Sequence, residues 1–252
     1  MANVIEVHDL VKKYGDLTAV DGISFHVTAG EVFGLLGPNG AGKTTTLEII
    51  ETLMPATSGR VTVAGYDIRT DAHAIRSQIG IQIQASGFYP YLTLAELLEM
   101  FGVMYCLPVD PMELLGKFGL QDKAGAQYSK LSGGQKQRFS LATTLVNSPR
   151  IVFLDEPTSG LDPQARANLW DLIRQIRDEG VTVVMTTHYM EEAEQLCDRL
   201  AVMDHGKIIA EGSPAHLIAH LLASGFKREV IVREASLEDV FLNLTGRHLR
   251  ES

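Results

Sequence analysis

The chain has 252 residues, of which 45% are hydrophobic, so it is long enough for one buried domain or for a core carrying a smaller subdomain. Its formal net charge of −9 argues against a general nucleic-acid binder, because such proteins usually present a basic face. No stretch approaches the ~18 consecutive apolar residues of a membrane-spanning helix, and the N-terminus lacks a signal-peptide pattern, so we expect neither feature.

The two cysteines, Cys106 and Cys197, are far apart and belong to no metal-binding or redox pattern. We therefore expect both to be reduced thiols in the core, in an intracellular setting.

Strand and helix periods alternate along most of the chain, which predicts an α/β fold with a mainly parallel sheet. Three segments with alternating apolar residues, 3–15, 22–37 and 59–68, are expected to form short strands. Together they are expected to form an antiparallel strand group beside the main sheet.

The segment GPNGAGKTT follows a predicted strand and opens a predicted helix with Leu47, Ile50 and Met54 on one face. Its spacing matches a phosphate-binding loop, in which glycines let backbone N–H groups converge on phosphate oxygens. Lys43 would neutralise the outer phosphates and Thr44 would offer its hydroxyl to Mg²⁺. The alternative is a chance glycine turn. The predicted nucleotide-binding residues here are Gly37, Pro38, Asn39, Gly40, Ala41, Gly42, Lys43, Thr44 and Thr45.

The alternation of residues 79–84 predicts a half-buried strand. Helical spacing then dominates to about residue 148 and predicts a helical subdomain over about 85–148. Its first apolar stripe indicates core packing, with an exposed partner groove as the alternative. The stripe consists of Leu94, Leu97, Leu98, Phe101 and Tyr105.

Within this subdomain, Ser132, Gly133 and Gly134 resemble a second phosphate-binding loop at the start of a helix. The chain already has a phosphate loop at 37–45, so the purpose of the second one needs explaining.

A buried strand, IVFL, carries Asp155 and Glu156 at its carboxyl end, where α/β folds place their ligands. Asp155 is suited to hold Mg²⁺, and Glu156 can accept a proton from a water that attacks phosphate. A surface ion pair is the alternative. His188 also ends a buried strand, at a position from which it could hydrogen-bond the γ-phosphate.

Further elements are a helix over 163–180, in which Trp170 borders the core, and a hairpin around His205 and Gly206. His216 and His220 are four residues apart, but a metal site is not expected because no third ligand is evident.

These motifs together resemble the ATP-binding cassette family over nearly the whole chain. The phosphate loop matches the family's Walker A motif, LSGGQ at 131–135 its signature, and IVFLDEP its Walker B strand. SGLD at 159–162 is similar to the D-loop, and His188 to the switch histidine.

The resemblance implies a P-loop NTPase core with a mainly parallel sheet, an antiparallel β subdomain and an inserted helical subdomain. The cassette would span 1–230 and a short extension 231–252. Tyr14 would stack on adenine, and Gln84 would contact Mg²⁺ as the glutamine of the Q-loop, although Gln82 is a close alternative. The segment 86–93 carries three aromatic residues that would either pack on the helical subdomain or form a docking groove for a membrane subunit.

The resemblance also implies an ATPase subunit that uses ATP and Mg²⁺ and is most similar to those of bacterial exporters of drugs, polysaccharides or lipids. Two copies, identical or not, would face each other, with each ATP between one Walker A loop and the partner's signature loop. Glu156, His188 and Gln84 would act in hydrolysis, and the trans contacts would come from Ser132, Gly133, Gly134, Gln135 and Asp162.

Expected partners are transmembrane permease subunits and no nucleic acid, with the chain in the cytoplasm on the inner face of the membrane. Three alternatives fit less well. A P-loop GTPase or kinase would leave LSGGQ unexplained, and a DNA-repair ATPase needs a coiled-coil insertion for which the motif spacing leaves no room. Translation-associated cassettes usually carry two such domains on one chain.

Overall fold

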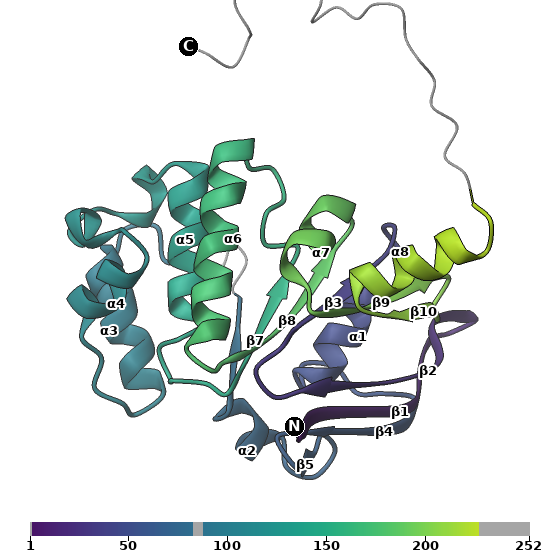
Figure 1. The fold of residues 1–252 in the computed structure, drawn as a ribbon. Helices are drawn as coiled ribbons and strands as arrows, with labels where there is room; N and C mark the ends of the chain where they lie inside the picture. The colour runs from purple at the N-terminus through teal and green to yellow at the C-terminus, as the bar shows by residue number, and fades with distance from the viewer. Residues whose placement is uncertain (1, 83–87, 227–252) are drawn as a thin grey trace, which may run out of the picture. The chain divides into compact units, whose positions relative to one another are not determined.

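A computed structural model describes residues 2–82 and 88–226 of the chain (Figure 1). The chain divides into two compact units, Met1–Leu217 and Ile218–Ser252. All strands described belong to the first unit, and α8 (Pro214–Ala223) is the last element described. The predicted extension at 231–252 lies outside the described residues. None of the helices described is long and apolar enough to cross a membrane.

The central sheet has six strands in the order β10-β9-β3-β8-β7-β6, and only β10 runs antiparallel to its neighbour. This confirms the mainly parallel sheet. The predicted hairpin is also confirmed, since His205 and Gly206 both have positive φ, as its two-residue turn requires. The strands are β3 (Val32–Leu36), β6 (Ile79–Ile81), β7 (Ile151–Asp155), β8 (Thr182–Thr187), β9 (Arg199–Asp204) and β10 (Lys207–Gly212).

A separate antiparallel sheet has the order β2-β1-β4-β5, as expected. Its first two strands are longer than predicted, with 12 residues each. Register shifts let their pairing continue past Asp9 and Gly22, which have positive φ and break the apolar alternation in the sequence. The strands are β1 (Asn3–Tyr14), β2 (Leu17–Thr28), β4 (Ser58–Val63) and β5 (Tyr66–Asp67).

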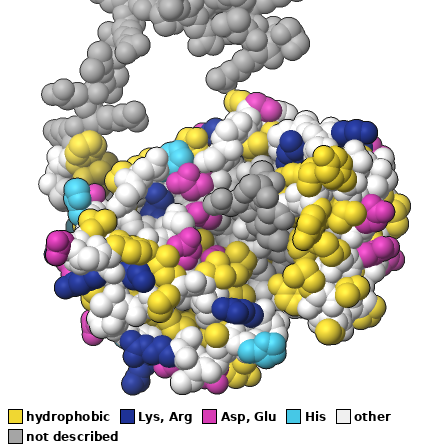
Figure 2. Space-filling view, turned by 180° about the vertical axis from the view of Figure 1, so that it is seen from behind, with side chains coloured by type: hydrophobic (Ala, Val, Ile, Leu, Met, Phe, Trp, Pro, Cys, Tyr) yellow, Lys and Arg dark blue, Asp and Glu magenta, His cyan; other side chains and the backbone are white. Residues whose placement is uncertain are grey.

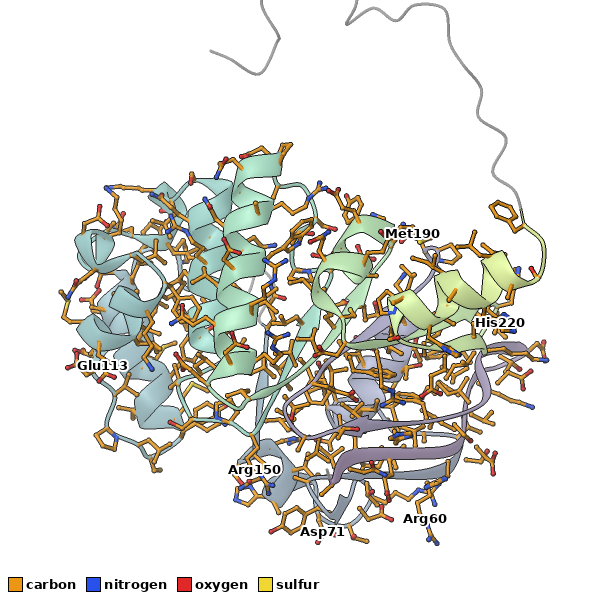
Figure 3. All side chains as sticks on the ribbon, viewed as in Figure 1. Arg60, Asp71, Glu113, Arg150, Met190 and His220 are labelled. Atoms are coloured by element: carbon orange, nitrogen blue, oxygen red, sulfur yellow. The ribbon has the colours of Figure 1, made fainter. Side chains whose placement is uncertain are left out.

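Helix α1 (Lys43–Ile50) lies between the two sheets and packs on both through Leu47, Ile49 and Ile50. It ends earlier than expected, because Thr52 adopts positive φ, and Met54 therefore lies beyond the helix. The short helix α2 (Ala72–Arg76) follows Asp71, which is labelled in Figure 3.

The other face of the central sheet is covered by helices that share one hydrophobic core with the helical subdomain (Figure 1). Leu94, Leu97 and Leu98 are fully buried, so the prediction that the apolar stripe packs in the core is confirmed for them. Tyr105, at the end of the stripe, is 43% exposed because α3 ends at Met104. The helices are α3 (Leu94–Met104), α4 (Pro111–Lys117), α5 (Gly133–Thr143), α6 (Pro163–Asp178) and α7 (Met190–Leu196), with short 3₁₀ turns at Gln121–Lys123 and Tyr128–Lys130.

The two cysteines differ, and the prediction of two core thiols is wrong for one of them. Cys197 is buried, but Cys106 is exposed, since it lies in the turn that leaves α3 with positive φ. Burial first, and then the charges of Glu192 and Asp198, raise the pKa of Cys197 to about 12.

Candidate functional site

The parallel register of the central sheet brings three loops together at one edge. Leu36 pairs with Thr187, and Asp155 pairs with Thr186, so β3, β7 and β8 end side by side. The glycine loop, Glu156 and His188 each follow one of these strand ends. The sequence pattern placed these groups at strand ends, and the register makes them neighbours.

The loop between β3 and α1 needs its glycines for two different reasons. Gly40 and Gly42 have φ of 81° and 99°, which disfavour residues with a Cβ. At Gly37, a Cβ would lie 2.2 Å from the Met203 carbonyl oxygen. The buried Lys43 extends back over this loop, and its Nζ donates to the carbonyl oxygens of Gly37 and Pro38 at 2.8 and 3.0 Å. Such a loop, with a helix beginning at its end, suits the phosphates of a nucleotide.

Thr44, the second residue of α1, faces Asp155 across the site. Its Oγ1 donates to the two Asp155 carboxylate oxygens at 3.2 and 3.3 Å. Thr186 Oγ1 donates to Asp155 Oδ1 at 2.5 Å, which fixes the carboxylate from the neighbouring strand. A hydroxyl and a carboxylate form an all-oxygen donor set, which fits Mg²⁺.

Glu156 lies at the centre of a second group of contacts. Its Oε1 is 3.1 Å from His188 Nδ1 and 3.7 Å from Lys43 Nζ, and its Oε2 accepts a hydrogen bond from Ser159 Oγ at 3.1 Å. Partial burial raises the pKa of Glu156, but His188, the Ser159 hydroxyl and the Lys43 charge together lower it below its ordinary value. These contacts therefore favour the ionised carboxylate of Glu156.

The backbone at Glu156 is also unusual, with φ of 46° in the left-handed region. A non-glycine residue in that region costs about 1–3 kcal/mol and persists only where its surroundings hold it. Here the Glu156 N–H donates to Thr186 Oγ1 at 3.0 Å, which turns the carboxylate out of the strand direction.

A hollow of about 680 Å³ joins these groups, and Tyr14 lies at its rim. Tyr14 is 44% exposed, its hydroxyl donates to Met54 Sδ, and Lys12 Nζ lies 5.0 Å from its ring centroid, so the ring is held in place with part of it exposed. That geometry is compatible with stacking on a base. The hollow is lined by Tyr14, Leu17, Ala19, Asn39, Gly40, Gly42, Lys43, Thr44, Thr45, Asp155, Glu156 and Ser159.

The second glycine loop lines a different hollow of about 510 Å³. Ser132 begins α5, since its Oγ accepts from Gln135 N at 3.3 Å and its N–H donates to Gln135 Oε1 at 3.0 Å. Gly133, Gly134 and Asp162 share this hollow with them. None of the residues lining it lines the Lys43 hollow. Asp162 begins α6, its Oδ1 accepting from Ala165 N at 2.9 Å.

Gln84, the residue predicted to contact Mg²⁺ from the Q-loop, lies outside the described residues. Gln82 follows the end of β6, and its Nε2 donates to Gln137 at 3.3 Å.

The aromatic residues of 86–93 were expected either to pack on the helical subdomain or to form a docking groove, and they differ in burial. Phe88 is buried against Phe101, Tyr128 and Phe139, whereas Tyr89 and Tyr91 are 62% and 83% exposed.

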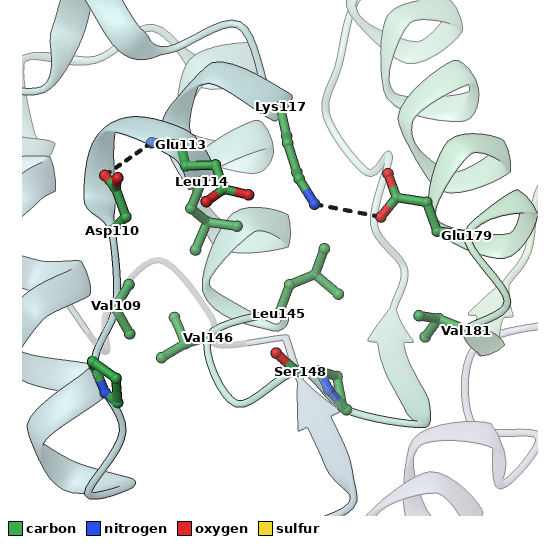
Figure 4. A pocket seen from close by; sticks show the side chains of 12 residues that line it. Val109, Asp110, Glu113, Leu114, Lys117, Leu145, Val146, Ser148, Glu179 and Val181 are labelled. Atoms are coloured by element: carbon green, nitrogen blue, oxygen red, sulfur yellow. Dashed lines mark hydrogen bonds and ion pairs between the residues drawn. The ribbon is translucent and has the colours of Figure 1, made fainter.

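A further hollow of about 340 Å³, drawn in Figure 4, contains none of the predicted site residues. It lies between α4, the segment 145–149 and the end of α6, where Lys117 Nζ is 3.6 Å from Glu179 Oε2. Among the described residues there is no group of three or more His, Cys, Asp and Glu that could hold a metal ion.

Sequence reasoning gave no role to Thr186 or Glu51, and it named Ser159 only as part of SGLD. Thr186 and Ser159 orient the two acids, and the only signal for Thr186 was a hydroxyl residue inside an apolar strand. Glu51 is 4% exposed, and burial, followed by the charges of Asp155 and Glu48, raises its pKa to about 8. Nothing in the sequence indicates that Glu51, an acid directly after an amphipathic helix, is buried.

Comparison with known proteins gives matches along most of the chain. The family model described as ABC transporter matches residues 20–159. The Nod factor export ATP-binding protein I of Ralstonia nicotianae is 37% identical, over 98% of this chain and 95% of that protein. The daunorubicin resistance ATP-binding protein DrrA3 of Streptomyces coeruleorubidus is 42% identical, over 92% of this chain and 74% of that protein.

A solved structure supports the same fold. It is the dimeric, post-hydrolysis state of the ATP-binding cassette MJ0796 bound to ADP and Pi, with a TM-score of 0.74 and 27% identity over 83% of this chain and 98% of that one.

Proposed function

The chain belongs to the ABC transporter family, and from this premise we propose that it is the ATP-hydrolysing subunit of a membrane exporter. Relatives named for Nod factor export and daunorubicin resistance support export over DNA repair or translation. The observation that carries the proposal is the hollow that Lys43, Thr44, Asp155 and Glu156 line together with Tyr14.

In this proposal the glycine loop binds the phosphates of ATP. Backbone N–H groups of the glycine loop and the N-terminus of α1 supply positive potential, and Lys43 exchanges its present carbonyl partners for phosphate oxygens. Tyr14 stacks on the adenine from the rim. Thr44 and Asp155 would hold Mg²⁺, which would supply positive charge to the phosphates when bound.

Glu156 is the general base that takes a proton from the attacking water. Its lowered pKa keeps it ionised, Ser159 donates a hydrogen bond to its Oε2, and His188 Nδ1 lies 3.1 Å from its Oε1. His188 holds the carboxylate and contacts the γ-phosphate, so it links the base to the group that is transferred. Gln84 is proposed to contact Mg²⁺ and assist hydrolysis, as expected from its position in the sequence.

The second glycine loop is proposed to act on the nucleotide of another copy. Ser132, Gly133, Gly134, Gln135 and Asp162 line a different hollow from the one lined by Lys43, which supports a role for them at a second nucleotide. Two copies, of this chain or of this chain with a related one, would each complete the other's site. The dimeric MJ0796 structure supports such pairing.

We propose that transmembrane permease subunits dock on the helical subdomain and place the chain at the inner face of the membrane. Hydrophobic side chains gather on that side of the molecule in Figure 2. Exposed apolar patches of this kind mark interaction surfaces. The large apolar side chains that are exposed on the helical subdomain are Tyr89, Tyr91, Val103, Met104, Tyr105, Leu107 and Met112.

The first test uses Glu156→Gln, which keeps the size of the side chain and removes the base. Turnover is expected to fall at least ~100-fold while ATP still binds, so that ATP accumulates in a closed dimer. Size-exclusion chromatography with light scattering measures the dimer, and Lys43→Ala, which should not bind ATP, is the control. A monomer in saturating ATP, or unchanged turnover, would contradict the proposal.

The second test identifies the partner. Affinity purification of the tagged chain from detergent-solubilised membranes should recover a multi-span membrane protein. Stimulation of its ATPase activity by DNA or ribosomes, with no membrane protein recovered, would overturn the assignment to transport.

A further inference from the structure

The imidazole of His188 lies against two side chains, Glu156 and Tyr189. Its Nδ1 is 3.1 Å from Glu156 Oε1, and its ring centroid is 4.1 Å from that of Tyr189, with the planes tilted by 38°. The Tyr189 N–H donates to Thr187 Oγ1 at 2.9 Å, and Thr187 is itself buried. Tyr189 therefore has a fixed backbone and presents its ring to the histidine.

A cation from another helix lies on the same tyrosine ring. The guanidinium carbon of Arg166, on α6, is 4.8 Å from the centroid of the Tyr189 ring, which is a cation–π contact. Arg166 makes no ion pair in the part of the chain that the structure describes, and its buried Nε has no hydrogen-bond partner there. Buried polar nitrogens usually have an acceptor, so the ring contact is the interaction that accounts for this position.

A second contact, one helical turn further along both helices, fixes the spacing between α6 and α7. Trp170 Nε1 donates to Glu192 Oε1 at 3.2 Å, and Glu192 is completely buried. Trp170 lies four residues after Arg166, and Glu192 three residues after Tyr189, so both pairs lie on facing sides of the two helices. Met190, the first residue of α7, marks this place in Figure 3.

We infer that Arg166 and Tyr189 are positioning residues for His188, because the Arg166 cation holds the Tyr189 ring against the imidazole and thereby directs it to Glu156. The inference rests on the proposed role of His188 in ATP hydrolysis. Neither residue touches Glu156 in any contact described, so both act through the histidine. An error of about 1 Å in such a group can slow catalysis about 100-fold, so a modest loss of support should be measurable.

The test measures steady-state ATP hydrolysis by the purified chain carrying single and paired substitutions. Tyr189→Leu removes the ring and should lower kcat about tenfold, with KM for ATP within about twofold of wild type. Tyr189→Phe keeps the ring and should restore kcat to within about twofold of wild type. Arg166→Met should lower kcat about threefold, and Arg166→Lys, which keeps a cation, should recover much of that loss.

A double-mutant cycle separates positioning from a general effect on folding. Adding Arg166→Met to Tyr189→Leu should cause no further loss of kcat, because the contact is already absent. Independent, multiplying losses in this pair would overturn the inference, as would a Tyr189→Phe protein as slow as Tyr189→Leu.

His188→Ala on its own distinguishes the two levels of the argument. If that variant hydrolyses ATP at the wild-type rate, the proposed role of His188 fails, and the inference fails with it. If His188→Ala abolishes turnover but Tyr189→Leu has wild-type kcat, the proposed function stands and the positioning role alone is wrong.

Discussion

Replacing Glu51 by glutamine should stabilise the nucleotide-free protein, and more so at high pH. Glu51 caps the C-terminal end of α1 and is buried. Desolvation of the carboxylate, then repulsion from Asp155 and Glu48, raise its pKa from 4.5 to about 8. Glutamine has nearly the same shape as glutamate and carries no charge. The substitution therefore removes the repulsion from Asp155 and Glu48 and the cost of burying a charged carboxylate.

The sign follows from which state holds the proton. Below about pH 4.5 Glu51 is protonated in the folded and unfolded chains alike, so it has no effect on the pH dependence of stability. Between about 4.5 and about 8 only the folded chain retains the proton, so stability falls as pH rises, and the loss is complete above about 8. Each pKa unit corresponds to about 1.4 kcal/mol, and the part of the loss between pH 6 and pH 9 is about 2–3 kcal/mol.

The free energy of unfolding is measured by urea titration followed by circular dichroism, in EDTA and without nucleotide, at several pH values from 6 to 9. The free energy of unfolding of Glu51→Gln should exceed that of wild type by an amount that grows about 2–3 kcal/mol across that range. Glu113→Gln is the matched control, because Glu113 is exposed on α4 (Figure 3), and its difference from wild type should stay constant. A difference for Glu51→Gln that does not change with pH, or that falls, would refute the reasoning.

Three shorter predictions concern other parts of the chain. Ser132→Arg should block ATP-dependent dimerisation while leaving binding of a fluorescent ATP analogue unchanged, and a dimer of normal stability by light scattering would contradict the trans role of this loop. Phe139→Ala, at a fully buried site, should lower the free energy of urea unfolding by about 3–5 kcal/mol, and a loss below about 1 kcal/mol would show that the helical subdomain does not unfold with the rest. In a thiol-reagent assay at pH 8, Cys106 should react within seconds to minutes, whereas Cys197, with its pKa of about 12, should react only after unfolding, and equal rates would be inconsistent with the burial of Cys197.

Much of the site could be predicted because its residue types are tied to short local patterns. The loop at 37–45 needs glycines where the backbone turns with positive φ and approaches phosphate, so the motif itself encodes the geometry. The boundaries of strands were less predictable. The register shifts in β1 and β2 extend the pairing past residues that interrupt the apolar alternation, and nothing in that alternation reports them.

The amino-acid sequence by itself determined the α/β fold class, the phosphate loop, the paired acids Asp155 and Glu156 and the hairpin, because each depends on residue type and near-neighbour spacing. Only the tertiary structure decided which of these groups meet. It separates the Ser132 loop from the Lys43 hollow, and it joins Arg166 to Tyr189 across two helices. Such contacts depend on how elements distant in the chain pack against each other, and spacing along the sequence carries no record of that packing.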